Sequence, residues 1–182
     1  MLHKGTVKIE TERLVLERFQ IKDAKFMFKN WANNKNVTKF LTWNAHENIE
    51  ETKLVINNWL QSYIKDNFYH WAIVYKEINE PIGSISVVEQ DEEKAQMILG
   101  YVIGEKWWGK GIVPEAYSKV IEFLFNEIKV KKIIGRHDVE NVNSGKVMLK
   151  CGLKYLRTDK KAGSNVTNKS CDLCIYEINN KS

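Results

Sequence analysis

The sequence has few cysteines, only two prolines and no long apolar run. Its longest apolar stretches, such as KVIEFLF, are interrupted by charges well before the roughly 18 residues that a bilayer span requires. The N-terminus also lacks the apolar core of a signal peptide. These absences exclude an integral membrane protein, and we expect a cytoplasmic protein without a membrane partner.

The three cysteines argue against a disulfide scaffold or a zinc centre. Cys151, Cys171 and Cys174 form an odd set with no second pair that would complete a zinc site. Free cysteine usually behaves as a small buried apolar residue, so the CDLC segment is better interpreted as part of a strand. We therefore predict no metal.

Composition and charge indicate one folded globular domain over residues 1–182, with 43% hydrophobic and 28% charged residues. The net charge of +5 favours an acidic partner only mildly, and a nucleic acid or a phosphorylated cofactor would suit it. Six tryptophans could stack on bases, but Trp31, Trp59 and Trp71 lie in apolar-periodic segments and are expected in the core. No known nucleic-acid-binding motif is present, so we expect no nucleic-acid partner.

Hydrophobic periodicity predicts strands alternating with helices. In chain order, the expected elements are a strand at 13–19, helices at 21–33 and 46–64, strands at 69–75, 81–89 and 94–103, a helix at 112–129, a strand at 131–138, a short helix at 141–152, and strands at 153–159 and 171–178. This order predicts the α/β (α+β) class, with one mixed sheet covered by helices.

The segment KWWGKGIVPEA joins an expected strand to a strongly amphipathic helix. Such a junction presents unpaired backbone N–H groups and the positive end of the helix dipole, which together attract anions. Gly109 and Gly111 allow close approach to the main chain, Lys106 and Lys110 add charge, and Pro114 removes an N–H that the first turn does not need. A tight turn with solvated lysines is the alternative. The well-marked strand and helix on either side favour a phosphate site.

Several segments together resemble the GNAT superfamily of acyl-CoA N-acyltransferases, in particular its RimJ/RimL-like branch. They are IETERLVLERF, FLTW, PIGSISV, LGYVIGEKWWGKGIVPEA and ENVNSGKVMLKCGLKY, which extend over nearly the whole chain. The resemblance implies a single GNAT-type domain with a mostly antiparallel sheet of about seven strands, splayed in the middle, and about four helices. It also implies acetyl-CoA (CoA) as cofactor and an amine as acceptor, and it is compatible with a homodimer.

The resemblance implies where the cofactor binds. Residues 106–111 correspond to the pyrophosphate loop, with Lys106 where the family has Gln or Arg, and the pantetheine arm lies between two splayed strands. A backbone N–H near Val102 would polarise the thioester carbonyl. Asn141 and Ser144 would lie near the thiol, with helix capping as the alternative for both. The expected cofactor-binding residues are Tyr101, Val102, Ile103, Lys106, Trp108, Gly109, Lys110, Gly111, Ile112, Val113, Asn141 and Ser144.

The customary catalytic residues of the family are absent. Ile98 stands in place of the usual base, a glutamate two residues before Gly100, and Met148 replaces the frequent acid, a tyrosine four residues before Gly152. The substitute candidates are Ser144 and Glu89, followed by Asp138 and Glu140. Alternatively there is no base, and the amine arrives neutral from water. At pH 7 about 10% of an α-amine is neutral, against less than about 0.1% of a lysine side chain, which favours an α-amine.

The sequence therefore predicts an N-acetyltransferase that moves an acetyl group from acetyl-CoA to a primary amine by direct attack in a ternary complex. A protein N-terminus is one candidate acceptor, and antibiotics or polyamines are others. A non-catalytic acyl-CoA-binding module is the alternative, because both customary residues are missing. The acceptor pocket is expected between the first two helices and the FLTWNAHE loop, where Trp43 and His46 are candidate lining residues.

Overall fold

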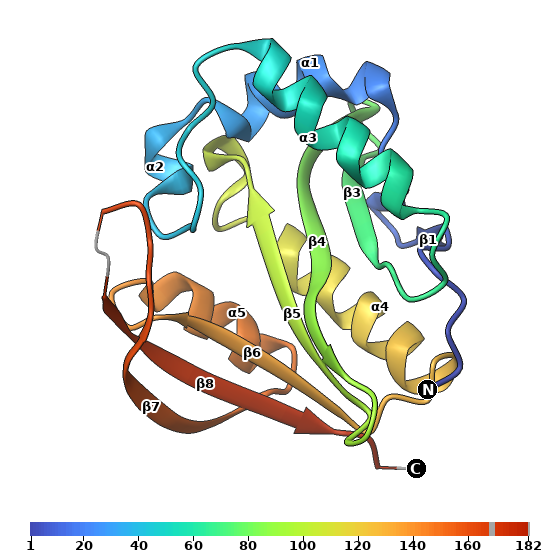
Figure 1. The fold of residues 1–182 in the computed structure, drawn as a ribbon, viewed down its shortest axis with the longest axis vertical. Coiled ribbons are helices and arrows are strands. Elements are labelled where there is room, and N and C mark those ends of the chain that lie inside the picture. The colour runs from blue at the N-terminus through green and yellow to red at the C-terminus, as the bar shows by residue number, and fades with distance from the viewer. Residues whose placement is uncertain (168–169, 182) are drawn as a thin grey trace.

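The computed structural model describes residues 1–167 and 170–181, whose strands form one eight-stranded sheet (Figure 1). The strand order is β1-β2-β3-β4-β5-β6-β8-β7, and every neighbouring pair is antiparallel except β5 and β6. The strands are β1 (Ile9–Glu10), β2 (Leu14–Glu17), β3 (His70–Tyr75), β4 (Glu80–Asp91), β5 (Gln96–Ile103), β6 (Lys132–Asp138), β7 (Lys154–Gly163) and β8 (Cys171–Asn179).

Helices cover both faces of the sheet. The helical segments are η1 (Ile21–Asp23), α1 (Ala24–Met27), the π-helical η2 (Phe28–Ala32), α2 (Lys35–Thr38), α3 (Ile49–Ser62), η3 (Glu105–Trp107), α4 (Ile112–Asn126) and α5 (Val142–Lys150). Side chains of α4 pack with Leu99 and Ile103 of β5 in the larger core. Side chains of α1, η2 and α3 pack on the opposite face in a second core, against which Val102 lies. Consecutive β5 residues therefore face opposite layers, as expected for a strand.

The predicted order of elements is confirmed, with three differences. The sheet gains the short strand β1, the short helix η3 follows β5, and the helix expected over 21–33 is divided into several short segments that continue to Thr38. The chain turns at Asn34, whose side chain accepts hydrogen bonds from the backbone of Asn36 and Val37 and so begins α2 as a new helix. As predicted, Trp31 is fully buried in the second core and Trp71 in the larger one, and Trp59 packs against the second core while partly exposed.

The predicted splay of the sheet is also confirmed. β5 and β6 pair in parallel from Gln96 with Lys132 to Leu99 with Gly135, after which the two strands separate (Figure 1). The last residues of β5 therefore remain paired with β4 on one side only. Within residues 1–167 and 170–181, no helix combines the length and apolarity of a membrane span.

Candidate active site

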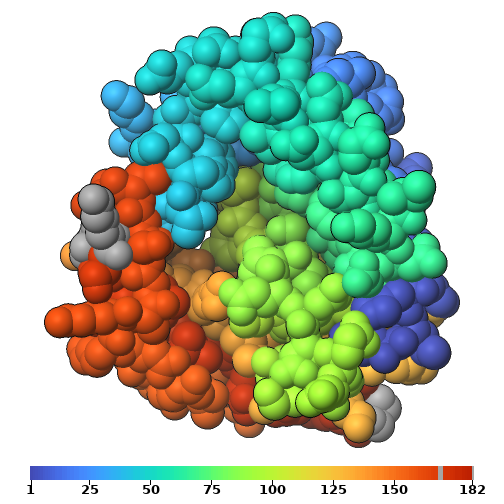
Figure 2. All heavy atoms as spheres, in the orientation of Figure 1, coloured from blue at the N-terminus to red at the C-terminus, as the bar shows by residue number. Residues whose placement is uncertain are grey.

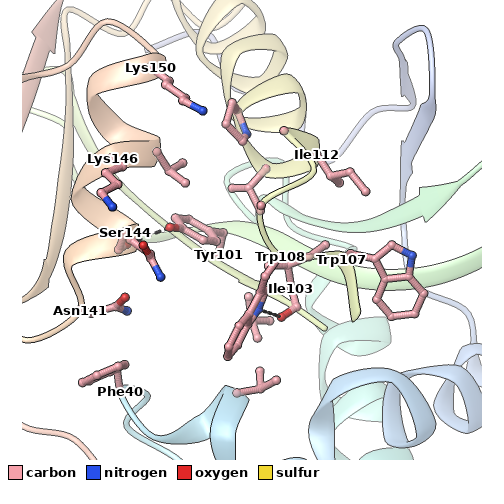
Figure 3. A pocket seen from close by; sticks show the side chains of 18 of the residues that line it. Phe40, Tyr101, Ile103, Trp107, Trp108, Ile112, Asn141, Ser144, Lys146 and Lys150 are labelled. Carbon is pink, nitrogen blue, oxygen red and sulfur yellow. Dashed lines mark hydrogen bonds between the residues drawn. The ribbon is translucent and has the colours of Figure 1, made fainter. Parts of the chain in front are cut away.

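A cavity of about 330 Å³ opens where β5 and β6 separate. Four parts of the chain line it: residues 101–103 at the end of β5, residues 107–114 apart from Lys110, one face of α5, and residues 36, 37, 40 and 41 around α2. Figure 3 shows Tyr101 and Ser144 pointing toward each other inside it, with Lys146 and Lys150 along α5. In the space-filling view, the sheet is hollowed between α2, the β4–β5 strands and the β7–β8 segment (Figure 2).

The strand register decides which backbone groups of β5 face this gap. The N–H of Gly104, the residue just after β5, donates to the carbonyl of Ile82 in β4, and backbone groups of consecutive strand residues point to alternate sides. Val102, paired with Ser84, therefore directs its N–H and C=O toward β4. Tyr101 and Ile103 direct theirs toward the gap. The free donor expected near Val102 therefore belongs to Tyr101 or Ile103.

One of these gap-facing groups already has a partner. The indole Nε1 of Trp108 donates to the carbonyl of Ile103 at 3.0 Å (Figure 3). Both N–H groups and the carbonyl of Tyr101 then remain as the polar edge of β5. An extended amide-containing chain would complete this edge as an additional strand does, so the geometry fits the pantetheine arm of coenzyme A.

The loop before α4 has the form of an anion site. Gly109 and Gly111 both have φ of +73°, a conformation that glycine adopts without strain. The backbone N–H groups of Gly109, Gly111, Ile112 and Val113 donate no hydrogen bond to the described part of the chain. Gly111 is the N-cap of α4 and has no side chain to cap these amides. These unpaired amides at the positive end of a 15-residue helix fit a diphosphate.

The lysines that line the cavity differ from those predicted. Lys106 lies over the Trp107 ring, 5.5 Å from its centroid, and neither Lys106 nor Lys110 belongs to the cavity lining. Lys146 and Lys150 of α5 line the cavity instead. They are four residues apart, so they share one face of the helix, and this spacing is the signal that the sequence reasoning overlooked.

Ser144 is held beside the end of β5 by Tyr101. The two hydroxyl oxygens are 2.8 Å apart, and Ser144 is only 8% exposed. Burial raises the pKa of Tyr101 to about 12, so its phenol stays protonated and can donate to or accept from Ser144. The ring of Tyr101 packs edge-on against Tyr117 of α4, which fixes its orientation.

Asn141 also reaches the cavity. It occupies the N-cap position of α5, yet its side chain makes no capping hydrogen bond. Of the two roles considered for this residue, capping is therefore not the one its side chain performs. The amide group remains available to a ligand in the cavity.

Positions 148 and 98 do not contribute to the cavity. Met148 is 1% exposed and packs on Gly135, where an added Cβ would lie 2.8 Å from the Met148 sulfur. A side chain at position 148 thus points into the core. Ile98 pairs with Glu89 beside a β-bulge in β4, and Glu89 is exposed and forms an ion pair with Arg136.

Among the described residues, no aspartate or glutamate lines the cavity. Of the two catalytic candidates, Ser144 lies in the cavity and Glu89 lies outside it. Asp138 is buried, and its carboxylate accepts hydrogen bonds from the Asn165 side chain at 2.6 Å and the Glu140 backbone at 2.8 Å. The site therefore has a hydroxyl pair at the end of β5 and no carboxylate that faces it.

The loop after α2 closes one end of the hollow. The N–H of Val166, before β8, donates to the carbonyl of Leu41 at 3.0 Å. Trp43 and His46 pack against each other at 5.3 Å between ring centroids and do not line the cavity. His46 instead bonds Thr52 at 2.7 Å. Within the described residues, no group of three or more His, Cys, Asp or Glu side chains could hold a metal.

Comparison with known proteins identifies the family. The family model for the acetyltransferase (GNAT) domain matches residues 13–154, well over half of the chain, and the protein therefore belongs to the GNAT family. The chain is 27% identical over 138 residues to an uncharacterized N-acetyltransferase, p20 of Bacillus licheniformis, covering 76% of this chain and 77% of p20. It is 24% identical over 157 residues to the [ribosomal protein uS5]-alanine N-acetyltransferase of Escherichia coli, covering 81% and 78%.

A solved structure supports the same assignment. The microcin C7 self immunity acetyltransferase MccE, in complex with acetyl-CoA and AMP, superposes with a TM-score of 0.83 at 25% identity over 93% of each chain. The protein is thus an acetyl-CoA-dependent N-acyltransferase with a GNAT fold. These relatives do not support the alternative of a non-catalytic acyl-CoA-binding module.

Proposed function

We propose that this enzyme acetylates the α-amino group of a protein N-terminus, by direct attack of the amine on acetyl-CoA in a ternary complex. The observation that carries the proposal is that, in the part of the chain that the structure describes, no carboxylate lines the cavity that contains the Tyr101–Ser144 hydroxyl pair. Such a site can supply a proton to a leaving group but cannot readily take one from a charged amine. The uS5-alanine N-acetyltransferase among the relatives acts on an acceptor of this kind.

Acetyl-CoA supplies an acetyl group activated as a thioester. The amides of residues 109–113 hold the diphosphate, and the gap-facing N–H of Ile103 binds an amide of the pantetheine arm. Because this arm runs along β5 away from the loop, the N–H of Tyr101 lies nearest the thioester and donates to its oxygen as negative charge develops there.

Ser144 acts as the proton donor to the departing sulfur. Its hydroxyl lies at the end of β5 where the thioester is expected, and the proton that it gives is replaced from water. Tyr101 keeps the Ser144 hydroxyl oriented, and its raised pKa prevents loss of its own proton near neutral pH. The proton of the attacking amine leaves to solvent through the open face of the hollow.

Without a general base in the cavity, the enzyme favours an acceptor amine that is already neutral in solution. An α-amine has a reference pKa near 8 and is about 10% neutral at pH 7, whereas a lysine side chain is below about 0.1%. A site without a general base therefore gains about 100-fold with an α-amine over a lysine from the neutral fraction alone. A small amine of low pKa would share this advantage, and MccE, a self immunity acetyltransferase, makes such an acceptor the second candidate.

The test is release of coenzyme A thiol from acetyl-CoA with a panel of amines. It includes peptides with a free N-terminus and no lysine, the same peptides blocked at the N-terminus and carrying one lysine, spermidine, and an aminoglycoside. We expect kcat/KM for the free N-terminus to exceed that of the blocked lysine peptide at least tenfold. Equal rates for the two peptides would refute the selection argument, and a preference for a non-peptide amine would favour the second candidate.

Ser144→Ala tests the proton donor separately. With the best acceptor of the panel, we expect kcat to fall by about 10- to 100-fold, at the lower end of general-acid contributions because a thiolate leaves easily. KM for acetyl-CoA should stay within about twofold. The matched control is Ser62→Ala, at the C-terminal end of α3 and outside the cavity lining. An unchanged kcat in Ser144→Ala would remove Ser144 from the mechanism.

A further inference from the structure

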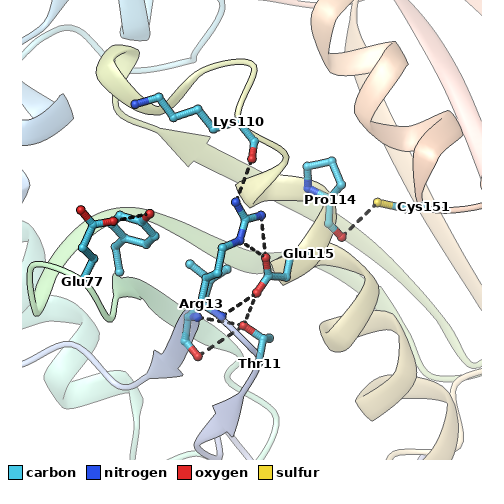
Figure 4. Close-up of polar contacts among 9 residues, drawn as sticks. Thr11, Arg13, Glu77, Lys110, Pro114, Glu115 and Cys151 are labelled. Atoms are coloured by element: carbon cyan, nitrogen blue, oxygen red, sulfur yellow. Dashed lines mark hydrogen bonds and ion pairs between the residues drawn. The ribbon is translucent and has the colours of Figure 1, made fainter.

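An arginine next to β2, distant in sequence from the 109–113 loop, holds this loop by hydrogen bonds (Figure 4). The Nη1 of Arg13, the residue just before β2, donates to the carbonyl of Lys110 at 3.0 Å. Its Nε and Nη2 reach one carboxylate oxygen of Glu115, in the first turn of α4, at 2.7 and 2.6 Å. The other carboxylate oxygen accepts from the Arg13 backbone at 3.0 Å and from the Thr11 hydroxyl at 2.5 Å.

The bond to Lys110 sets the direction of an amide. Lys110 lies between the two glycines of positive φ, so the peptide units around it can rotate with little steric resistance. In a planar trans peptide the C=O and the following N–H point in opposite directions. Because Arg13 holds the Lys110 carbonyl on the sheet side, the N–H of Gly111 points the other way. Gly111 lines the cavity, so this N–H is directed at the proposed diphosphate position.

The ion pair between Arg13 and Glu115 compensates the negative charge of the Glu115 carboxylate. A carboxylate in the first turn of α4 lies beside the site where two phosphates are expected, and an uncompensated negative charge there would oppose them. Burial raises the pKa of Glu115, but hydrogen bonds from Thr11 and Arg13 outweigh this and lower it, so the side chain stays ionised. The arginine therefore cancels a charge that is always present.

We infer that Arg13 is a positioning residue for acetyl-CoA, which orients the Gly111 amide toward the diphosphate and shields it from the charge of Glu115. This inference rests on the proposed assignment of the diphosphate to the 109–113 loop, and it is independent of which amine is the acceptor. It assigns a role in the site to the TERL segment, which is distant from the loop in the sequence.

The test measures coenzyme A binding by calorimetry without any acceptor, followed by acetyl-CoA kinetics. We expect Arg13→Gln to weaken binding and raise KM for acetyl-CoA by about 10- to 50-fold, with kcat at saturation within about twofold. The informative variant is Arg13→Gln combined with Glu115→Gln. Without Arg13 the Glu115 carboxylate is unshielded, so neutralising it should make the double variant bind coenzyme A about three- to tenfold more tightly than Arg13→Gln. This gain is expected although the double variant has lost more native contacts than the single one.

Arg13→Lys separates the two effects, because it retains the charge and loses the forked donors. Its affinity should lie between those of wild type and Arg13→Gln. Arg157→Gln, which breaks an exposed ion pair with Asp159 on β7, is the matched control and should bind like wild type. A double variant that binds no better than Arg13→Gln would overturn the shielding role, and an unchanged Kd in Arg13→Gln would overturn the inference. If wild type itself fails to bind coenzyme A, the proposed function fails instead.

Discussion

Replacing Lys150 by Gln removes a positive charge from the wall of the cavity across from the 109–113 loop (Figure 3). Lys146 lies one turn earlier on the same face, and neither ammonium group makes an ion pair within the described residues. Two unpaired lysines on a wall near the diphosphate position would suit a further phosphate. Coenzyme A carries one on its ribose, at the 3′ position.

The expected effect is modest, because both lysines are exposed. An exposed ion pair contributes about 0.2–1 kcal/mol, and a hydrogen bond to a charged group contributes about 1.5–3 kcal/mol. A value near 1 kcal/mol corresponds to about a fivefold change in KM, since 1.4 kcal/mol is tenfold. Screening should reduce the effect further as the ionic strength rises from 0.01 to 1 M, where the Debye length falls from about 30 to 3 Å.

The assay compares acetyl-CoA with 3′-dephospho-acetyl-CoA for wild type, Lys146→Gln and Lys150→Gln. We expect each variant to raise KM for acetyl-CoA by about three- to tenfold, and to have little effect on KM for the dephospho compound. Lys22→Gln, an exposed lysine of η1 outside the cavity lining, is the control. If Lys150→Gln raises KM equally for acetyl-CoA and for the dephospho compound, Lys150 does not contact the 3′-phosphate, and our assignment of that phosphate to this wall of the cavity is wrong.

Two further predictions concern the loop and the core. Gly109→Asn and Gly109→Asp have nearly the same shape, and both residues tolerate positive φ, so they differ mainly in charge at a position where an added Cβ meets no atom within 4 Å. In calorimetric titrations we expect the Asn variant to bind coenzyme A at least tenfold more tightly than the Asp variant, and equal affinities would contradict a diphosphate at this loop. The second prediction concerns His70, which is packed among aromatic rings, where burial lowers its pKa to about 3. Unfolded histidine binds its proton below about 6.5, so the free energy of unfolding should fall by about 2 kcal/mol between pH 7 and 5. His70→Phe should flatten this slope in urea titrations, and an unchanged slope would exclude His70 as its cause.

The loop and its flanking elements were predictable from sequence because their determinants are local. The strand before Gly109, the glycines themselves and the amphipathic α4 all lie within a short stretch, and each carries a pattern that depends on near neighbours. The same is true of Asn34 in retrospect. Asn is among the preferred helix N-cap residues, so Asn34 could have been recognised as the start of a new helix that divides the predicted first one.

The features that were missed depend on contacts between distant parts of the chain. Arg13 and Lys110 are 97 residues apart, and no local pattern links them. The choice between Val102 and its neighbours as gap-facing donors requires the register of β5 against β4. Glu89 was a candidate because of its place in the sheet plan, but a bulge between Val87 and Glu89 shifts the register there, and the side chain pairs with Arg136. Residue propensities and sequence spacing do not encode strand register or contacts between residues far apart in the chain.

The absence of the customary side chains at positions 98 and 148 follows from how this fold distributes the chemistry. In the mechanism that we propose, backbone N–H groups bind the diphosphate and the thioester oxygen, and any residue supplies such a group once the strands splay and the loop is held. Only the proton for the sulfur needs a side chain, and Ser144, held by Tyr101, presents a hydroxyl at the end of β5. Position 148 then needs no catalytic side chain, and Met148 packs in the core against Gly135. A base is dispensable only if the acceptor arrives neutral, so the apolar residue at position 98 is itself an argument about the pKa of the amine that this enzyme accepts.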